Sequence, residues 1–201
     1  MTNISRRTPP LTVIITLLLT VLSASTSRAS VTTEERFIYY EISGNTASEL
    51  RASINSHTRN FKNRFDAATQ WKITWQFGYK PRQKKCKITE VNIDASIDYV
   101  LPQWPDASKH PNKQLVNHWQ RFITQLLAHE KQHGAFVKAA TLEVERRIIT
   151  ADDTSFAPPN CKKLQQLANQ RAQSVITRLE MQHATFDRET NHGRDTGALF
   201  P

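Results

Sequence analysis

The apolar residues of this chain change from a period of two to a helical period, and this change constrains the fold more than any other feature. Apolar and polar residues alternate from Trp71 to Tyr79 and again from Val91 to Tyr99, as half-buried strands require. A short basic turn separates the two runs, so they predict a long antiparallel hairpin with a bulge at Thr89-Glu90. From about residue 112, apolar residues recur every three or four positions, which is typical of a helix.

Shorter signals complete this order of elements. The segment from Arg36 to Ser43 is rich in aromatic and β-branched residues and predicts a strand. Thr46 and Glu49 have the spacing of a capping box, which predicts a short helix to about His57. A second long helical pattern runs from Lys162 to Phe186, and a loop is expected after it. We therefore expect an α+β fold: an antiparallel sheet with a long hairpin, a long central helix and a packed C-terminal helix.

The first 29 residues are typical of a secretory signal peptide. Arg6 and Arg7 precede an apolar stretch from Leu11 to Leu22, and Ser27-Arg28-Ala29 fits a small-x-small cleavage site. We expect a signal peptide at 1–29, one mature domain at 30–201, and a periplasmic or secreted location. The apolar stretch is short for a hydrocarbon core of about 30 Å, so no stable membrane span is expected after cleavage. An uncleaved anchor is the alternative.

Export changes how the cysteines and the charge are interpreted. The only two cysteines, Cys86 and Cys161, lie far apart in sequence, and an oxidising compartment favours a disulfide over two free thiols. The formal charge of +9 falls to +6 without residues 1–29, which contain three arginines and no acidic residue. An exported protein is not expected to bind nucleic acid. The basic run from Lys80 to Lys87 is interpreted as a solvated loop rather than an anion-binding patch.

The motif HExxH occupies positions 129 to 133, within the strongest helical pattern. Residues four apart lie on one face of a helix, so His129 and His133 can bind the same Zn²⁺ ion. Glu130 would lie beside the open coordination position and act as general base toward a zinc-bound water. Both histidines continue an apolar stripe, so we expect them to face the protein interior. A helix with two surface histidines is the alternative.

A catalytic zinc usually has three protein ligands, so HExxH leaves one ligand to be found. The metzincin pattern is excluded, because positions 136 and 139 hold Phe and Ala rather than Gly and His. His192, a loop histidine beside a glycine, is the first candidate. Asp187 is the alternative ligand, or a carboxylate that orients an imidazole. Less favoured candidates are a histidine expected in the core and three glutamates: His183, Glu143, Glu145 and Glu180.

Several further segments occur in order along the mature chain: YYEISGNTASELRASI, W-x-I-T-W, LPQW, W-x-x-F before HExxH, NCxxL and a closing D-x-x-T-x-H-G. In combination they resemble a family of uncharacterised bacterial proteins, described as predicted secreted Zn-dependent proteases and catalogued as a domain of unknown function. The resemblance covers nearly the whole mature chain. It implies a metallopeptidase with His129 and His133 as zinc ligands and Glu130 as base, and it supports Asp187 and His192 as site residues.

We therefore predict an exported, monomeric zinc metallopeptidase whose substrate is a peptide or protein of the cell envelope. The run from Val91 to Tyr99 is the candidate edge strand for pairing with an extended substrate. One of four tyrosines is expected to supply a transition-state hydroxyl: Tyr39, Tyr40, Tyr79 or Tyr99. Two alternatives stay open. One is a non-catalytic periplasmic binding or assembly module with a zincin-like fold, and the other is a zinc amidase acting on cell-wall material.

Overall fold

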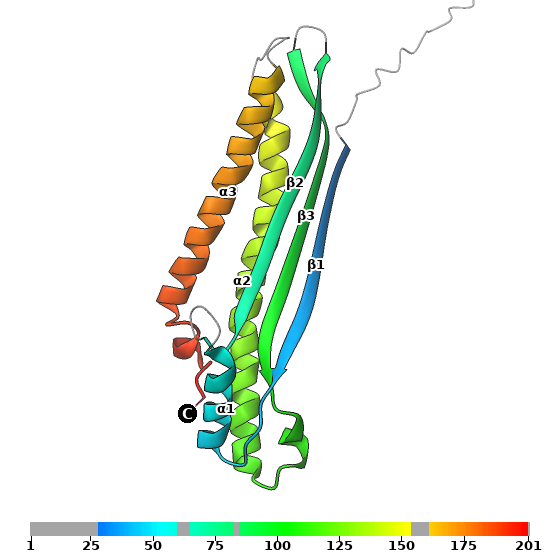
Figure 1. Ribbon diagram of the computed structural model, residues 1–201. Helices are drawn as coiled ribbons and strands as arrows, with labels where there is room; N and C mark the ends of the chain where they lie inside the picture. The colour runs from blue at the N-terminus through cyan, green and yellow to red at the C-terminus, as the bar shows by residue number, and fades with distance from the viewer. Residues whose placement is uncertain (1–27, 60–64, 83–84, 154–160, 201) are drawn as a thin grey trace, which may run out of the picture.

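The structure is a computed structural model that describes residues 28–59, 65–82, 85–153 and 161–200 (Figure 1). Its strands and helices confirm the α+β class. The main elements are β1 (Arg28–Glu41), α1 (Ala47–Thr58), β2 (Ala68–Arg82), β3 (Lys85–Gln103), α2 (Lys113–Ile149) and α3 (Cys161–Glu189). Three short 3-10 helices accompany them: η1 (Pro105–Lys109), η2 (Thr150–Asp153) and η3 (Arg194–Thr196).

The sheet has the strand order β1-β3-β2. The antiparallel hairpin of β2 and β3 is confirmed, and so is its bulge: Gly78 pairs with Glu90 and Tyr79 with Ile88, so Thr89 is the extra residue. The expectation of an all-antiparallel sheet is wrong, because β1 pairs with β3 in parallel. Alternation along a strand specifies which face each side chain takes, but it does not specify which neighbour the strand pairs with.

The candidate edge strand is also corrected. The run from Val91 to Tyr99 lies in β3, which has β1 on one side and β2 on the other. Its backbone groups are therefore paired in both directions and offer no edge to a substrate. The edges of the sheet are β1 and β2.

Both long helices lie against the same face of the sheet (Figure 1). This face carries the alternating apolar residues of the hairpin, and β3 contributes the fully buried Ile97 and Tyr99. Two contacts from β2 to α3 lie along it: the Trp75 indole donates to Asn169, and the Tyr79 hydroxyl donates to Gln165. The opposite face presents polar side chains such as the Arg36–Asp98 ion pair. The alternation in the sequence thus places both long helices, including the HExxH segment, on one side of the sheet.

The predicted disulfide between Cys86 and Cys161 is confirmed, with a Cα–Cα distance of 5.3 Å. It links the first residue of α3 to the start of β3. The disulfide therefore lies at the end of the hairpin where β2 is followed by β3. The predicted signal peptide lies largely on residues 1–27, outside the described residues. Among the residues that are described, no helix is long and apolar enough to cross a membrane.

Candidate metal centre

The HExxH segment lies near the middle of α2, on the face that packs against the sheet. The helix begins at Asn112, whose side chain accepts a hydrogen bond from the Leu115 amide as an N-cap. His129, Glu130 and His133 are only 5–6% exposed, and they continue the buried stripe of this helix. The expectation that these side chains face the protein interior is confirmed, and the alternative of two surface histidines is wrong.

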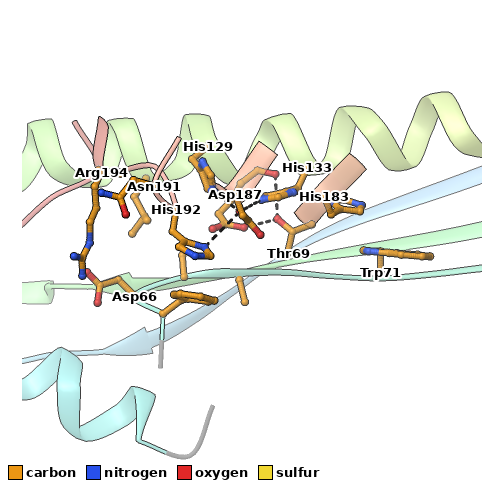
Figure 2. A pocket seen from close by; sticks show the side chains of 16 residues that line it. Asp66, Thr69, Trp71, His129, His133, His183, Asp187, Asn191, His192 and Arg194 are labelled. Atoms are coloured by element: carbon orange, nitrogen blue, oxygen red, sulfur yellow. Dashed lines mark hydrogen bonds and ion pairs between the residues drawn. The ribbon is translucent and has the colours of Figure 1, made fainter. Parts of the chain in front are cut away.

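Three ligand atoms from two helices converge at this position (Figure 2). Nε2 of His129 lies 3.1 Å from Oδ1 of Asp187, and Nε2 of His133 lies 2.9 Å from the same oxygen. The two Nε2 atoms are 3.2 Å apart. Four ligands at about 2.0–2.1 Å from a tetrahedral zinc are separated from one another by about 3.3–3.4 Å. The three atoms thus form a triangle of nearly the size that one metal ion requires, and this group could hold one.

The charge and packing of the group agree with a cation. Burial alone would raise the pKa of Asp187, but the contacts of its carboxylate with the His129 and His133 rings outweigh burial and hold that pKa well below its ordinary value. The carboxylate is therefore ionised. The Phe186 ring stacks on His129 at 4.8 Å and meets His133 edge-on at 5.2 Å, so one apolar side chain holds both imidazoles.

His192, the first candidate for the third ligand, lies outside this triangle. Its Nδ1 is 3.8 Å from Oδ1 of Asp187, its side chain is 43% exposed, and its ring stacks on Phe65 at 4.1 Å. Asp187, the alternative candidate, supplies the third atom of the group that could hold a metal. Asp187 rather than His192 thus belongs to the group that could hold a metal, and His192 lies beside that group in the pocket lining.

The turn after α3 explains why the closing D-x-x-T-x-H-G segment contains its glycine. Asn191, His192 and Gly193 all have positive φ angles, so the chain turns sharply away from the helix axis. The Thr190 hydroxyl donates to Phe186 O and accepts a hydrogen bond from the Gly193 amide, which closes the turn. A Cβ atom at Gly193 would lie 3.1 Å from Cγ of His129. The glycine thus allows the turn and leaves room for the His129 ring.

Glu130 is oriented by a residue that sequence reasoning missed. The Thr69 hydroxyl of β2 donates to Oε2 of Glu130 at 2.6 Å. Burial raises the pKa of Glu130, and this hydrogen bond opposes the rise. Thr69 precedes Trp71 by two positions, so extending the strand alternation would have placed it on the inner face of the sheet.

His183 also belongs to the site, although not as a member of the ligand triangle. Its Nδ1 lies 2.6 Å from Nδ1 of His133, and its ring stacks against Trp71 at 5.6 Å. Burial, assisted by the neighbouring His133, lowers the pKa of His183 to about 4, so its imidazole is neutral. Of the three glutamates considered as ligands, Glu143 instead pairs with Arg146 and Arg147.

The site opens into a pocket of about 410 Å³ (Figure 2). Its lining includes the segment from Phe65 to Thr69 together with Trp71, and the end of α3 with Asn191, His192 and Arg194. Among the described residues, none of the four candidate tyrosines lines this pocket. The pocket therefore gives no support to the expectation that a tyrosine supplies a transition-state hydroxyl.

Gly134, which follows HExxH directly, is expected not to tolerate a side chain. A Cβ atom there would overlap the Tyr99 hydroxyl and approach Cζ of that ring to 2.8 Å. Tyr99 is fully buried and cannot move aside freely. Alanine normally stabilises a helix by about 1 kcal/mol relative to glycine. We expect Gly134→Ala to destabilise the fold instead, by about 1–3 kcal/mol in urea unfolding, because it overpacks the core.

The control for this prediction is the double variant with Tyr99→Phe. Removing the hydroxyl removes the closest overlap but also the hydrogen bond from Tyr99 to Glu35, so Tyr99→Phe alone is measured as well. Gly134→Ala should then cost less stability in the Tyr99→Phe background than in the wild type. If Gly134→Ala is as stable as the wild type, or its cost is the same in both backgrounds, the contact with the Tyr99 hydroxyl does not explain the glycine.

Comparison with known proteins identifies a family. No curated protein and no solved structure is significantly similar to the chain. A family model described as "Bacterial protein of unknown function (DUF922)" matches residues 37–193, a span that includes both long helices and every member of the ligand triangle. This match extends over most of the sequence, and the chain belongs to the bacterial DUF922 family.

Proposed function

We propose that this protein is an exported zinc-dependent hydrolase of peptide bonds. The observation that carries the proposal is the triangle of His129 Nε2, His133 Nε2 and Asp187 Oδ1, which lines a pocket together with Glu130. Two imidazoles and one carboxylate form a ligand set that zinc accepts in catalytic sites. The disulfide between Cys86 and Cys161 agrees with an oxidising compartment.

His129, His133 and Asp187 would hold the metal. When bound, zinc supplies a water of lowered pKa and polarises the carbonyl oxygen of the bond to be cleaved. The anionic Asp187 balances part of the ion's charge, and Phe186 keeps the two rings in place. These residues therefore bring the ligands together before the metal arrives, which reduces the reorganisation that binding requires.

Glu130 would act as the general base. Thr69 donates a hydrogen bond to Oε2, which restricts the rotation of the carboxylate, and Oε1 would then serve in the proton transfer. The carboxylate would take a proton from the attacking water on Oε1 and return it to the nitrogen of the leaving amine. Because Glu130 is 5% exposed and lines the pocket, bulk water does not compete strongly for this position.

A peptide is favoured as substrate because an edge strand borders the site. Ala68 and Thr69 begin β2 and line the pocket, and among the described strands β2 pairs with β3 on one side and with none on the other. An extended chain can add to such an edge by backbone hydrogen bonds. The strand that would pair with substrate is thus β2, the hairpin partner of the run from Val91 to Tyr99.

The test begins with the metal content of the mature protein, measured by elemental analysis at neutral pH, with His129→Ala as the control that should lack metal. The zinc-loaded protein is then incubated with a diverse peptide library, and cleavage is followed by mass spectrometry before and after chelation. We expect cleavage that chelation removes and added zinc restores. A protein without zinc would contradict the proposal. A protein that binds zinc but cleaves no peptide would also contradict it. Hydrolysis of cross-linked cell-wall peptides by that protein would then favour an amidase. The absence of any hydrolysis would favour a binding module.

A further inference from the structure

His183 and Asp187 stand four residues apart on α3, so they share a face of that helix just as His129 and His133 share a face of α2. The two pairs meet: Asp187 contacts both histidines of α2 through Oδ1, and His183 contacts His133 through Nδ1 (Figure 2). Each helix thus contributes a pair of polar side chains to one cluster, in which the α2 pair is buried and the α3 pair is partly buried. The role of Asp187 follows from the ligand triangle, but His183 lies outside it and needs another explanation.

The direction of the hydrogen bond between His133 and His183 follows from the ligand triangle. His133 points Nε2 toward Asp187 and His129, so this nitrogen must carry a lone pair if it is to bind a metal. In a neutral imidazole the proton is then on Nδ1, which must donate. The atom placed to accept it is Nδ1 of His183, at 2.6 Å. The reverse direction would put the proton of His133 on Nε2 and block metal binding.

The packing around His183 fixes the position of its ring. The ring stacks on Trp71 with a centroid distance of 5.6 Å and 17° between the planes, and it lies against the His133 ring at 4.8 Å and 26°. Trp71 belongs to β2, the same strand that supplies Thr69. The acceptor nitrogen is therefore held between a strand and a helix rather than carried on a mobile side chain.

We propose that His183 is a positioning residue that accepts the Nδ1 proton of His133 and so fixes the tautomer and ring orientation that metal binding needs. The proposal rests on the metal centre of the proposed function. Carboxylates and backbone carbonyls are the usual acceptors for metal-binding histidines, and losing such a partner typically lowers metal affinity about 10–100-fold. Here the imidazole of His183 is the acceptor. Helix α3 thus supplies both a metal ligand, Asp187, and the acceptor that orients His133.

A matched pair of variants isolates the acceptor. Asn places an oxygen on Cγ, where His183 has Nδ1, and Leu places a methyl group at the same point. Both variants lose the stack on Trp71 equally. We expect His183→Leu to lower zinc affinity about 10–100-fold, and His183→Asn to stay within about threefold of the wild type. The dissociation constants are measured by competition with a chelator, and the melting temperatures of the metal-free variants provide the folding control.

Equal losses of zinc affinity in the two variants would overturn the proposal, because packing alone would then explain both losses. Wild-type zinc affinity in His183→Leu would overturn it as well. A second measurement needs no variant: nitrogen-15 NMR of the zinc-loaded protein should show a proton on Nδ1 of His133 and none on Nδ1 of His183. A protonated Nδ1 on His183 would also overturn it. If the wild-type protein binds no zinc, the proposed function fails and this proposal falls with it; if it binds zinc and the matched pair behaves alike, only this proposal fails.

Discussion

Glu130→Gln is expected to abolish hydrolysis while the protein keeps its metal. Gln has the shape of Glu, and its amide oxygen can still accept the hydrogen bond from Thr69, which lies at 2.6 Å from the native carboxylate. The amide cannot take up a proton from the attacking water. General acid–base catalysis contributes typically 10²–10⁴-fold, so kcat should fall by a factor on the order of 10³. The measurement is steady-state hydrolysis of a cleavable peptide.

The control for this variant must separate catalysis from folding and metal binding. Glu145→Gln makes the same chemical change further along α2, away from the pocket lining, and should leave kcat unchanged. Zinc content should be the same in both variants and the wild type, because Glu130 is not part of the ligand triangle. If Glu130→Gln keeps more than about a tenth of wild-type kcat, Glu130 is not the base.

Much of the fold was predictable because its signals are local. The capping box is one such local signal, because its hydrogen bonds join residues three or four positions apart. Thr46 Oγ1 accepts a hydrogen bond from the Glu49 amide, and Glu49 Oε2 accepts one from the Asn45 amide. The hairpin, its bulge and the helices follow from hydrophobic period in the same way. The pairing of β1 was not predictable on these terms, because strand order depends on contacts between segments far apart in sequence.

The same division applies to the site. His129, Glu130 and His133 could be assigned from the sequence because helix geometry alone brings them to one face. The choice between Asp187 and His192 depends on where α3 ends. The sequence pattern predicts a loop at Asp187, whereas α3 continues through Glu189 and carries that carboxylate onto the histidines. The spacing of His183 and Asp187 on one helix was the signal that would have favoured Asp187.

Asp187→Ala is accordingly expected to lose zinc binding, whereas His192→Ala should keep it. The first variant removes an ionised oxygen that lies 2.9 Å and 3.1 Å from the two Nε2 atoms and leaves two neutral ligands. Losing only a hydrogen-bond partner of a metal ligand costs about 10–100-fold in affinity, so losing the ligand itself should cost more than about 100-fold. His192 is 43% exposed and outside the triangle, so its loss should change zinc affinity by less than about threefold.

The two variants are matched because both residues lie in the D-x-x-T-x-H-G segment and both line the pocket. Chelator competition gives the zinc dissociation constants, and unfolding of the metal-free proteins shows whether either change disturbs the fold. The opposite outcome, in which His192→Ala loses zinc and Asp187→Ala retains it, would make His192 the third ligand. It would require the turn from Asn191 to Gly193 to rearrange around the metal, since Nδ1 of His192 lies 3.8 Å from the Asp187 carboxylate oxygen. Reduced hydrolysis with unchanged zinc affinity in His192→Ala would instead place that imidazole on the substrate side of the site, in the part of the pocket lining where its ring stacks on Phe65.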